Sequence, residues 1–278
     1  MNRKIRLALA AAAAAVTLAS CGGSSDAADT TVASDSSTPV PGAELTFQPV
    51  AGGKLTVCSD VPYEPFEYQD ENGNWTGFDM DIMSAVAQRY GLTLEVSKQP
   101  FDSILVAVNA GTCDVVASSV TITDERKKNV LFSDPYFDAD QSLLVRKEDE
   151  ATLTDLDALA GKTVAVQSGT TGEIYAKENI KDSSTKIQSF EDAAAMFLAL
   201  ESKQVDAVLQ DFPINAFRAV KQGNTVVTST FTTNEQYGFA VAMENTALQE
   251  AINDSLRDFN AQGVYDEIFA KYFGAKNG

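Results

Sequence analysis

The segment Asp114–Arg126 passes from an apolar run into a polar loop and ends in an arginine. Residues 115–117 read Val-Val-Ala, the kind of short apolar run that a parallel strand uses when it is buried on both faces. Thr123 is followed by two acidic residues, which predicts a helix capped there with Arg126 as its third residue. A buried strand that leads through a polar loop into a helix is typical of α/β proteins.

Three hydroxyl side chains, Ser118, Ser119 and Thr121, lie between the predicted strand and the predicted helix. In an open α/β sheet, ligands bind in the crevice at the carboxyl ends of the strands. These hydroxyls, the free amides of a helix N-terminus and the guanidinium of Arg126 together suit a small carboxylate. Taken alone, the segment favours a plainer interpretation, a solvated helix arginine beside polar loop residues, and the surrounding chain has to decide between the two.

Strands and helices alternate through the first half of the chain. A strand is predicted at Lys54–Cys58, followed by a stiff loop with two prolines and two aromatic residues. Helices are predicted at Asp79–Tyr90 and from Phe101 to Gly111, with a strand over Leu92–Val96 between them. This β-α-β-α-β order predicts a parallel, doubly wound sheet.

The second half repeats this plan after an extended crossover at residues 141–145. Thr170 and Glu173 have the spacing of a capping box, so a helix N-terminus is expected to face a crevice there. An amphipathic helix is predicted at Phe190–Leu200, with Phe190, Ala194, Phe197 and Leu198 buried. The remaining predicted elements are strands at 163–166 and 205–209, a return crossover at 237–241, and helices at 247–259 and 265–272.

Length, charge and composition narrow the functional classes. The chain has 278 residues, enough for two ordinary domains, and its formal net charge of -18 argues against nucleic acid or an anionic membrane surface as a partner. It contains no histidine, which removes every catalytic triad, acid–base pair and metal site that depends on imidazole. No cofactor and no metal site is predicted.

The N-terminal residues have the pattern of an export signal. Residues 1–20 combine a basic start with an apolar stretch, Leu7–Ala19, that is too short for a stable membrane anchor. Residues 18–21 read Leu-Ala-Ser-Cys and resemble the lipobox of bacterial lipoproteins, which implies cleavage before Cys21 and lipid attachment to its sulfur. A plain secretory cleavage site is the alternative. Residues 21–50 are polar and are expected to form a disordered tether.

Six short motifs occur in order between Lys54 and Phe273. They are Asp60-x-x-Tyr63-x-Pro65-Phe66-Glu67, Gly77-Phe78-Asp79-x-Asp81, Thr121-Ile122-Thr123-x-x-Arg126, Phe132-Ser133-x-Pro135-Tyr136, Gln167-x-Gly169-Thr170-Thr171-Gly172-Glu173 and Asp206-Ala207-Val208-x-x-Asp211. In this order they resemble the family 3 extracellular solute-binding proteins of polar amino acid ABC transporters, which include histidine-, glutamine- and lysine/arginine/ornithine-binding proteins. The resemblance covers essentially the whole predicted mature domain.

The resemblance implies a periplasmic-binding-protein fold of type II, with two α/β lobes, each a doubly wound and mostly parallel sheet. Two extended hinge crossovers would join the lobes, which would close over a polar amino acid. Lobe 1 would comprise residues 52–141 and 239–278, and lobe 2 residues 142–238.

The resemblance also implies a set of ligand-binding residues. Arg126 would bind the α-carboxylate, helped by Ser119, Thr121 and the amides around Thr170 and Thr171. Asp211 would bind the α-ammonium, with Ser118 as a further acceptor. The full set is Asp60, Tyr63, Phe101, Ser118, Ser119, Thr121, Arg126, Gln167, Gly169, Thr170, Thr171 and Asp211.

The identity of the bound amino acid stays open at this point. Tyr63 and Phe101 would flank its side chain, and Asp60 would lie near the far end. A buried carboxylate at that position leans toward a cationic side chain, because it would be costly without a counter-charge. Asp60 could equally cap a turn or accept a hydrogen bond from an amide, so basic ligands and amide or acidic ligands remain equal alternatives.

Other acidic residues are interpreted as architecture. In Gly77-Phe78-Asp79 the glycine would form a turn and Asp79 would cap a helix. The pairs Glu64/Glu67 and Asp79/Asp81 could suggest a glycosidase, but a stiff turn and a helix start explain them better.

Three functional classes compete, and a transport receptor is favoured. An enzyme on the same scaffold, such as a dehydratase, is opposed by the intact amino acid site, by the missing histidine and by the absence of a further domain after Phe273. A sensor domain would be followed by a membrane helix and a signalling module, whereas this sequence stops at Gly278. The expected protein is a monomer, anchored by lipid outside the cytoplasmic membrane or periplasmic, that serves the transmembrane subunits of an ABC permease.

Cys58 and Cys113 remain after lipidation of Cys21. In the family that the chain resembles, their strands are neighbours, and an oxidising compartment permits a disulfide. We expect them to pair, although parallel strands could leave them more than the permitted ~7 Å apart as two buried free cysteines.

Overall fold

The computed structural model describes residues 42–275. The expected signal peptide, the lipidation of Cys21 and the first part of the expected tether lie outside these residues and stay predictions. Across the described range, no helix combines the length and the apolar composition that crossing a membrane requires.

The first sheet has five strands in the order β4-β1-β5-β12-β6. β1 is parallel to β4 and to β5, whereas β12 is antiparallel to both of its neighbours because it returns from the C-terminal part of the chain. The strands span Lys54–Ser59 (β1), Thr93–Lys98 (β4), Val115–Val116 (β5), Val130–Phe132 (β6) and Ala240–Ala242 (β12).

The second sheet also has five strands, in the order β11-β7-β10-β8-β9. β8 is parallel to β9 and β10, and β7 is antiparallel to β10 and β11. The strands span Phe137–Arg146 (β7), Thr163–Gln167 (β8), Lys186–Phe190 (β9), Ala207–Asp211 (β10) and Thr225–Tyr237 (β11), and a separate hairpin pairs Tyr68–Gln69 (β2) with Trp75–Thr76 (β3).

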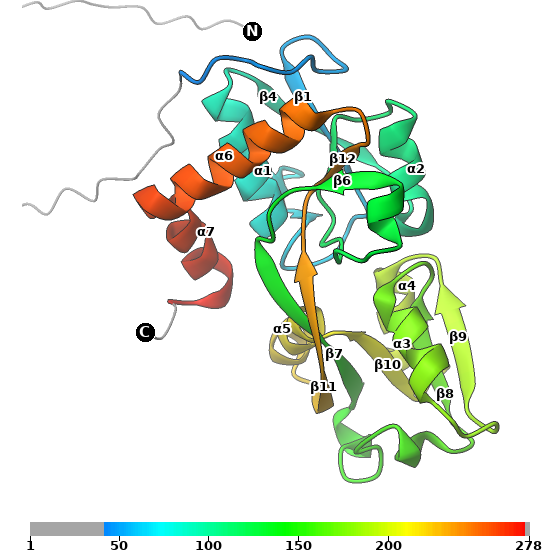
Figure 1. The fold of residues 1–278 in the computed structure, drawn as a ribbon. Coiled ribbons are helices and arrows are strands. Elements are labelled where there is room, and N and C mark those ends of the chain that lie inside the picture. Colours follow the sequence, from blue (N-terminus) through cyan, green and yellow to red (C-terminus); the bar gives the residue numbers. More distant parts are fainter. Residues whose placement is uncertain (1–41, 276–278) are drawn as a thin grey trace, which may run out of the picture. The chain divides into compact units, whose positions relative to one another are not determined.

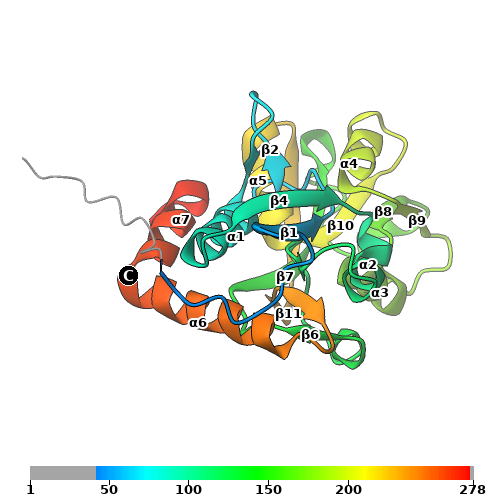
Figure 2. The ribbon, with the colours of Figure 1, turned by 90° about the horizontal axis from the view of Figure 1, so that it is seen from above.

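Helices cover both faces of each sheet, as the predicted doubly wound fold requires (Figure 2). Alternate residues of one strand explain why: Leu55 and Val57 pack with the cluster that holds α1 and α6, and Cys58 packs with α2 on the opposite face. The helices span Phe78–Arg89 (α1), Ile104–Asn109 (α2), Thr171–Asn179 (α3), Ala193–Glu201 (α4), Phe212–Gln222 (α5), Thr246–Gln262 (α6) and Val264–Phe273 (α7).

The same alternation places α3 and α4 on opposite faces of the second sheet. Val164 and Val166 of β8 share a core cluster with Ala176 of α3, whereas Ala165 shares the other cluster with Met196 of α4. The sheets are therefore buried on both sides, and their ligand-accessible edge is at the strand ends.

The two long strands β7 and β11 run side by side from the region of the first sheet into the second (Figure 1). The expected crossover at residues 141–145 lies within β7, and the expected return at 237–241 covers the end of β11 and the start of β12. The exact division of the chain into lobes stays a prediction.

The helix predicted to begin at Thr123 was a wrong assignment. A single 3₁₀ turn, Arg126–Lys128, stands there, and β6 begins at Val130, so the chain has no room for an α-helix. Thr123 nevertheless behaves as a cap, because its Oγ1 accepts a hydrogen bond from the Arg126 amide at 3.1 Å.

The start and the phase of the predicted helix at Phe190–Leu200 were also wrong. Phe190 ends β9, and α4 begins three residues later, where the Asp192 side chain accepts a hydrogen bond from the Ala195 amide at 2.7 Å. Phe197 is buried as predicted, but Ala194 is exposed and Leu198 is 63% exposed. The buried positions are instead Ala193, Met196, Ala199 and Leu200.

The ordered part of the chain begins before residue 50. Phe47 is buried against Tyr90, with 5.5 Å between the ring centroids, and the Val50 amide donates to Asp114 at 2.7 Å. One aromatic side chain and these backbone hydrogen bonds are enough to hold residues 42–50, the end of the expected tether, against the first sheet.

Cys58 and Cys113 form a disulfide, with their Cα atoms 5.7 Å apart, so this prediction is confirmed. Cys58 lies in β1 beside Val116 of the neighbouring β5, and both cysteines are buried in the cluster around Ile104. The bridge ties the start of the Asp114–Arg126 segment to the first strand.

Candidate functional site

A small cavity lies between residues of the first sheet and residues of the second. Every residue expected to bind ligand lines it except Gly169, and Glu67 lines it in addition. The lining residues are Asp60, Tyr63, Glu67, Phe101, Ser118, Ser119, Thr121, Arg126, Gln167, Thr170, Thr171 and Asp211.

The cavity is built at the carboxyl ends of four strands. Asp60 follows β1, Ser118 follows β5, Gln167 ends β8 and Asp211 ends β10. Because parallel strands end at the same edge of a sheet, residues far apart in the chain are brought to one place.

Arg126 is held by backbone oxygens and an aromatic ring. Its Nη1 donates to the Thr121 carbonyl at 2.7 Å and its Nη2 to the Gly169 carbonyl at 3.0 Å, while its Cζ lies 5.3 Å from the centre of the Phe101 ring. Burial lowers the pKa of Arg126 from its usual value, and the charges of Asp211 and Glu235 oppose that shift. Gly169, the one expected residue outside the cavity lining, thus acts on Arg126.

Asp211 occupies the N-cap position of α5 and is buried. Its Oδ1 accepts a hydrogen bond from Gln141 Nε2 at 2.6 Å, and its Oδ2 accepts one from the Tyr237 hydroxyl at 2.5 Å. Burial, reinforced by the charge of Glu235, raises the pKa of Asp211 to about 6. A cation placed against this carboxylate would favour its charged form.

Asp60 and Gln167 meet across the cavity, one from each sheet. Gln167 Nε2 donates to Asp60 Oδ2 at 2.5 Å. Burial raises the pKa of Asp60 to about 6, and the hydrogen bond from Gln167 partly opposes that shift.

Tyr63 and Glu67 are fixed by a closed turn. The Tyr63 amide donates to the Glu67 carbonyl at 2.7 Å, and the Glu67 amide returns a bond to the Tyr63 carbonyl at 3.2 Å. Phe66, between them, is fully buried, and its carbonyl lies 2.2 Å from where a Cβ on Gly77 would stand. Glycine is therefore required at position 77, where φ is +121°, for the turn to pack against the start of α1.

Two buried carboxylates, Glu67 and Asp79, contact the residues Ser118 and Ser119, which we call the serine loop. Glu67 accepts hydrogen bonds from the hydroxyls of Ser118 at 3.1 Å and Ser119 at 3.3 Å, and Asp79 accepts one from the Ser119 amide at 2.9 Å. Burial raises the pKa of Asp79 to about 7, and burial together with the charge of Asp79 holds the pKa of Glu67 well above its usual value. Asp79 is thus not the helix cap that the sequence predicted; Gly77 occupies that position.

A further carboxylate, that of Glu235 in β11, binds two hydroxyl side chains that line the cavity. Its Oε2 accepts hydrogen bonds from the hydroxyls of Thr121 at 3.0 Å and Thr171 at 2.6 Å, and its Oε1 accepts one from Gln141 Nε2 at 3.2 Å. Thr121 belongs to the segment after β5 and Thr171 to the first turn of α3, so Glu235 links both halves of the site.

The N-terminus of α3 faces the same cavity. The predicted cap is confirmed: Thr170 Oγ1 accepts a hydrogen bond from the Glu173 amide at 3.1 Å. Glu173 in turn accepts a bond from the Gly169 amide at 3.0 Å, one residue before the cap. The first amides of a helix have no intrahelical partner, so those of Thr171 and Gly172 are available donors for an anion.

The sequence reasoning did not identify Glu67, Glu235 and Gln141 as part of the site. Glu67 follows a buried phenylalanine in a proline-rich loop, and an acid next to a core aromatic was the available signal. Glu235 lies in a polar stretch of β11, where nothing in the sequence marks the side chain that turns inward. Gln141 was noted only as the start of a crossover.

The arrangement suits a small zwitterion better than a metal ion. One guanidinium, a helix N-terminus and the carboxylates Asp60, Glu67 and Asp211 line the same cavity. Within residues 42–275, no group of three or more metal-ligating side chains is arranged to hold a metal ion.

The chain is similar to known proteins over nearly all of its described length. Bacterial extracellular solute-binding proteins, family 3, match residues 55–275. A probable histidine-binding protein from Neisseria gonorrhoeae is 35% identical over 282 aligned residues, which cover 100% of this chain and 98% of that protein.

Solved structures agree with the sequence comparison. An ancestral arginine-binding protein bound to arginine superposes with a TM-score of 0.75 at 39% identity, covering 80% of this chain and 99% of its own. An ancestral amino acid-binding protein that is a precursor of cyclohexadienyl dehydratase superposes with a TM-score of 0.75 at 38% identity, covering 80% and 96%. The two-lobed fold is thus shared, and the chain belongs to the family 3 bacterial extracellular solute-binding proteins.

Proposed function

We propose that this protein is the substrate-binding component of an amino acid ABC importer and that it captures a polar L-amino acid with a cationic side chain. One observation carries the proposal: Arg126 and Asp211 line a single cavity from the two sheets, and within residues 42–275 neither has an opposite charge in direct contact. A ligand with one carboxylate and one ammonium supplies both missing partners.

The ligand's carboxylate binds Arg126 and the first amides of α3. The hydroxyl protons of Thr121 and Thr171 are directed to Glu235, so the charged guanidinium and the helix amides supply the main donors. The ammonium binds Asp211, whose two oxygens are already oriented by Gln141 and Tyr237.

The side chain of the ligand extends between Tyr63 and Phe101 toward Asp60. An amino acid zwitterion adds no net charge to a cavity that has more carboxylates than guanidinium groups, and a cationic side chain reduces this imbalance. Relatives support this class: an ancestral arginine-binding protein was solved with arginine bound. The aromatic faces of Tyr63 and Phe101 also suit a planar cation.

Capture proceeds by closure of two lobes, residues 52–141 with 239–278 and residues 142–238. The hinges are at about Asp140–Leu143 and Gly238–Ala240, where β7 and β11 connect the two sheets. Because Arg126 belongs to one lobe and Thr170 and Asp211 to the other, only a closed form lets one small ligand contact all of them. Small-angle scattering should show a smaller radius of gyration when ligand saturates the protein; an unchanged radius contradicts closure.

The protein acts outside the cytoplasm and delivers its ligand to the transmembrane subunits of a permease. The extracellular family and the signal pattern at residues 1–21 support export, and Cys21 is the proposed lipid anchor. The protein is proposed to work as a monomer, without nucleic acid and with no membrane attachment other than the lipid.

An enzyme on this scaffold is the second candidate, because one similar structure is a precursor of cyclohexadienyl dehydratase. The chain has no histidine for general acid–base work, and its site matches recognition of an intact zwitterion. When an amino acid ligand is incubated with a stoichiometric amount of the protein, its NMR spectrum should show no chemical change. Conversion of the ligand into a product would favour the enzyme.

A thermal-shift screen of the twenty amino acids tests the proposed function. A ligand at 100 times its dissociation constant stabilises the folded state by about 2.7 kcal/mol, which is readily measured. Arginine, lysine or histidine should give the largest shift, and calorimetry then gives the affinity. A preference for an acidic amino acid overturns the cationic class, and no shift with any of the twenty overturns the function.

A further inference from the structure

Both hydroxyl protons of the serine loop are already used in hydrogen bonds. The hydroxyls of Ser118 and Ser119 both donate to Glu67, and the Ser119 amide donates to Asp79. A serine hydroxyl has one proton and two acceptor positions. Ser118 uses one acceptor position for the Asp60 amide at 3.0 Å. Both serine oxygens therefore retain acceptor capacity, and neither retains a hydroxyl proton.

The position of Glu67 is fixed by its surroundings, so its hydrogen bonds from the two serine hydroxyls are held in place. It is fully buried, its backbone is paired with Tyr63 in the closed turn, and Phe66 anchors the turn in a cluster of aromatic rings. Ser119 is held as well, in a left-handed backbone conformation with φ +49°. A non-glycine residue in this region is uncommon and is maintained by its surroundings, here by the bond from its amide to Asp79.

We propose that Glu67, as a carboxylate, is a positioning residue for ligand recognition: by accepting hydrogen bonds from the hydroxyls of Ser118 and Ser119, it leaves both serines as acceptors toward the cavity and so makes this side of the site select an α-ammonium. The inference rests on the proposed function and assigns to Glu67 a part of its selectivity. Asp211 supplies the charge that attracts the ammonium, and Glu67 determines that the serines opposite it accept hydrogen bonds.

Glu67→Gln tests this assignment with almost no change of shape. A glutamine amide donates from its nitrogen, so one of the two serines must accept from position 67 and turn its own proton toward the cavity. That proton faces the ligand's ammonium. Binding of an α-amino acid should therefore weaken, whereas binding of the same molecule without its amino group should not.

The probes are two matched pairs measured by calorimetry: L-arginine with 5-guanidinopentanoic acid, and L-glutamine with glutaramic acid. In Glu67→Gln, the preference for the amino acid over its des-amino partner should fall about tenfold or more, the scale of one charge-assisted hydrogen bond. The dissociation constant of the des-amino acid should change by less than about threefold. A role limited to loop structure would weaken both members of a pair alike.

Two further variants keep the test decisive. Glu64→Gln removes a carboxylate from the same loop that contacts Lys221 and neither serine, so the preference should stay at the wild-type value. Glu67→Asp shortens the side chain by one methylene, cannot keep both serine bonds, and should lower the preference in the same direction if Glu67→Gln does not fold.

The outcomes separate this inference from the proposed function. A wild-type protein that binds none of the twenty amino acids overturns both. A wild-type protein that prefers the amino acids, together with an unchanged preference in Glu67→Gln and Glu67→Asp, overturns the role of Glu67 alone.

Discussion

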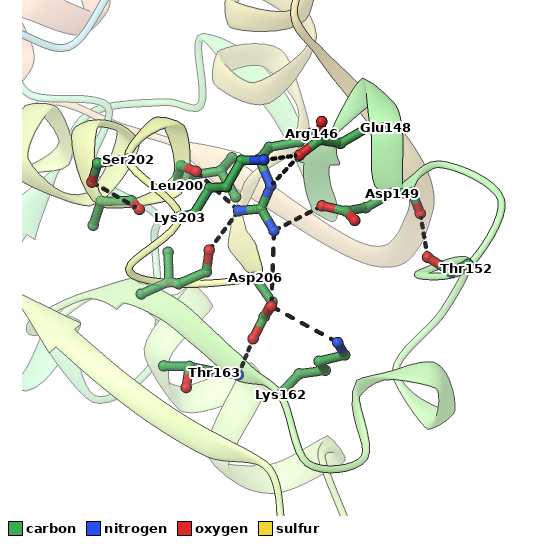
Figure 3. Close-up of polar contacts among 12 residues, drawn as sticks. Arg146, Glu148, Asp149, Thr152, Lys162, Thr163, Leu200, Ser202, Lys203 and Asp206 are labelled. Atoms are coloured by element: carbon green, nitrogen blue, oxygen red, sulfur yellow. Dashed lines mark hydrogen bonds and ion pairs between the residues drawn. The ribbon is translucent and has the colours of Figure 1, made fainter.

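Two arginines of this protein have opposite surroundings, although the sequence presents them alike. Arg146 lies at the end of β7 and is enclosed by acids: its Nη2 is 2.7 Å from Asp149 and 3.8 Å from Asp206, and its Nε is 3.7 Å from Glu148 (Figure 3). Its Nη1 also donates to the carbonyls of Leu200 at 2.9 Å and Val205 at 2.6 Å. Its charge is therefore balanced by acids of the fold itself.

Arg126 donates to two carbonyls as well, but the ion pairs among residues 42–275 do not include it. Its nearest acids, Asp211 and Glu235, act at longer range and are engaged with Gln141. The difference teaches how to tell a structural arginine from a binding one: the first has its counter-charges built in, and the second is positioned by neutral groups and leaves its charge for a ligand.

The largest effect should come from Arg126→Ala. Removal of the guanidinium takes away a charge-assisted contact and leaves the ligand's carboxylate desolvated in the cavity, so binding should weaken by about 2–5 kcal/mol. The free energy of unfolding without ligand should change by less than about 1 kcal/mol. Calorimetry and urea unfolding measure the two quantities, and near-wild-type affinity would remove Arg126 from the site.

Arg146→Ala should show the reverse pattern. The substitution leaves two carbonyls and Asp149 without their donor, and the side chain it removes is only 13% exposed, so unfolding should become easier by about 1–3 kcal/mol. Ligand affinity at 25 °C should stay within about twofold, because the network is at the far end of β7 from Gln141. A large loss of affinity with unchanged stability would contradict the comparison.

Lysine at each position sharpens the contrast with a smaller effect. A lysine keeps the charge and loses the planar fork, so Arg126→Lys should lose about 1–2 kcal/mol of binding and Arg146→Lys about 1 kcal/mol of stability. The same calorimetry and urea titrations apply. If Arg126→Lys binds as weakly as Arg126→Ala, geometry rather than charge dominates the contact.

Most of the fold and of the cavity lining could be predicted from the sequence because both depend on local patterns. Apolar runs set the strands, and in a parallel sheet the residues at the ends of neighbouring runs must meet at one edge, as Asp60 and Ser118 do in the first sheet and Gln167 and Asp211 do in the second. The Thr170 cap depends on two residues three apart and was predicted correctly for the same reason.

The predictions failed where parts of the chain that are distant in sequence determine the local structure or the burial of a side chain. Arg126 stands on a 3₁₀ turn because β6 starts too soon for a helix, and Leu198 is exposed because α4 starts at Ala193, after the Asp192 cap, rather than at Phe190. Glu67 and Glu235 were missed because their burial depends on serines and threonines far away in the sequence. No local pattern distinguishes these acids from solvated ones.

The smallest expected effect is the dependence of stability on pH. Its sign differs between the site acids and the acids around Arg146. Burial raises the pKa of Asp60 and of Asp211 to about 6, above the usual value of 3.8. Around Arg146 the shift is opposite, because Lys203 holds the pKa of Glu148 below its usual value. Without ligand, the contribution of the two site acids to stability is fully present below about pH 4 and is lost as the pH rises through about 6, where the folded state releases its protons. The contribution of Glu148 is present above its unfolded pKa of 4.5 and is lost as the pH falls through its lower folded pKa.

A cationic ligand reverses the trend of the site acids, because it favours their charged forms. Affinity for L-arginine should therefore rise severalfold between about pH 5 and pH 7.5, while the melting temperature of the ligand-free protein receives a falling contribution from the same two groups. Asp60→Asn should flatten the rise in affinity, since one of the titrating carboxylates is gone, and Glu148→Gln should leave it unchanged. Calorimetry across this range makes the measurement, with buffers of different ionisation enthalpy to count the protons released. An affinity for L-arginine that falls as the pH rises through 6 would mean that these carboxylates do not face the cation.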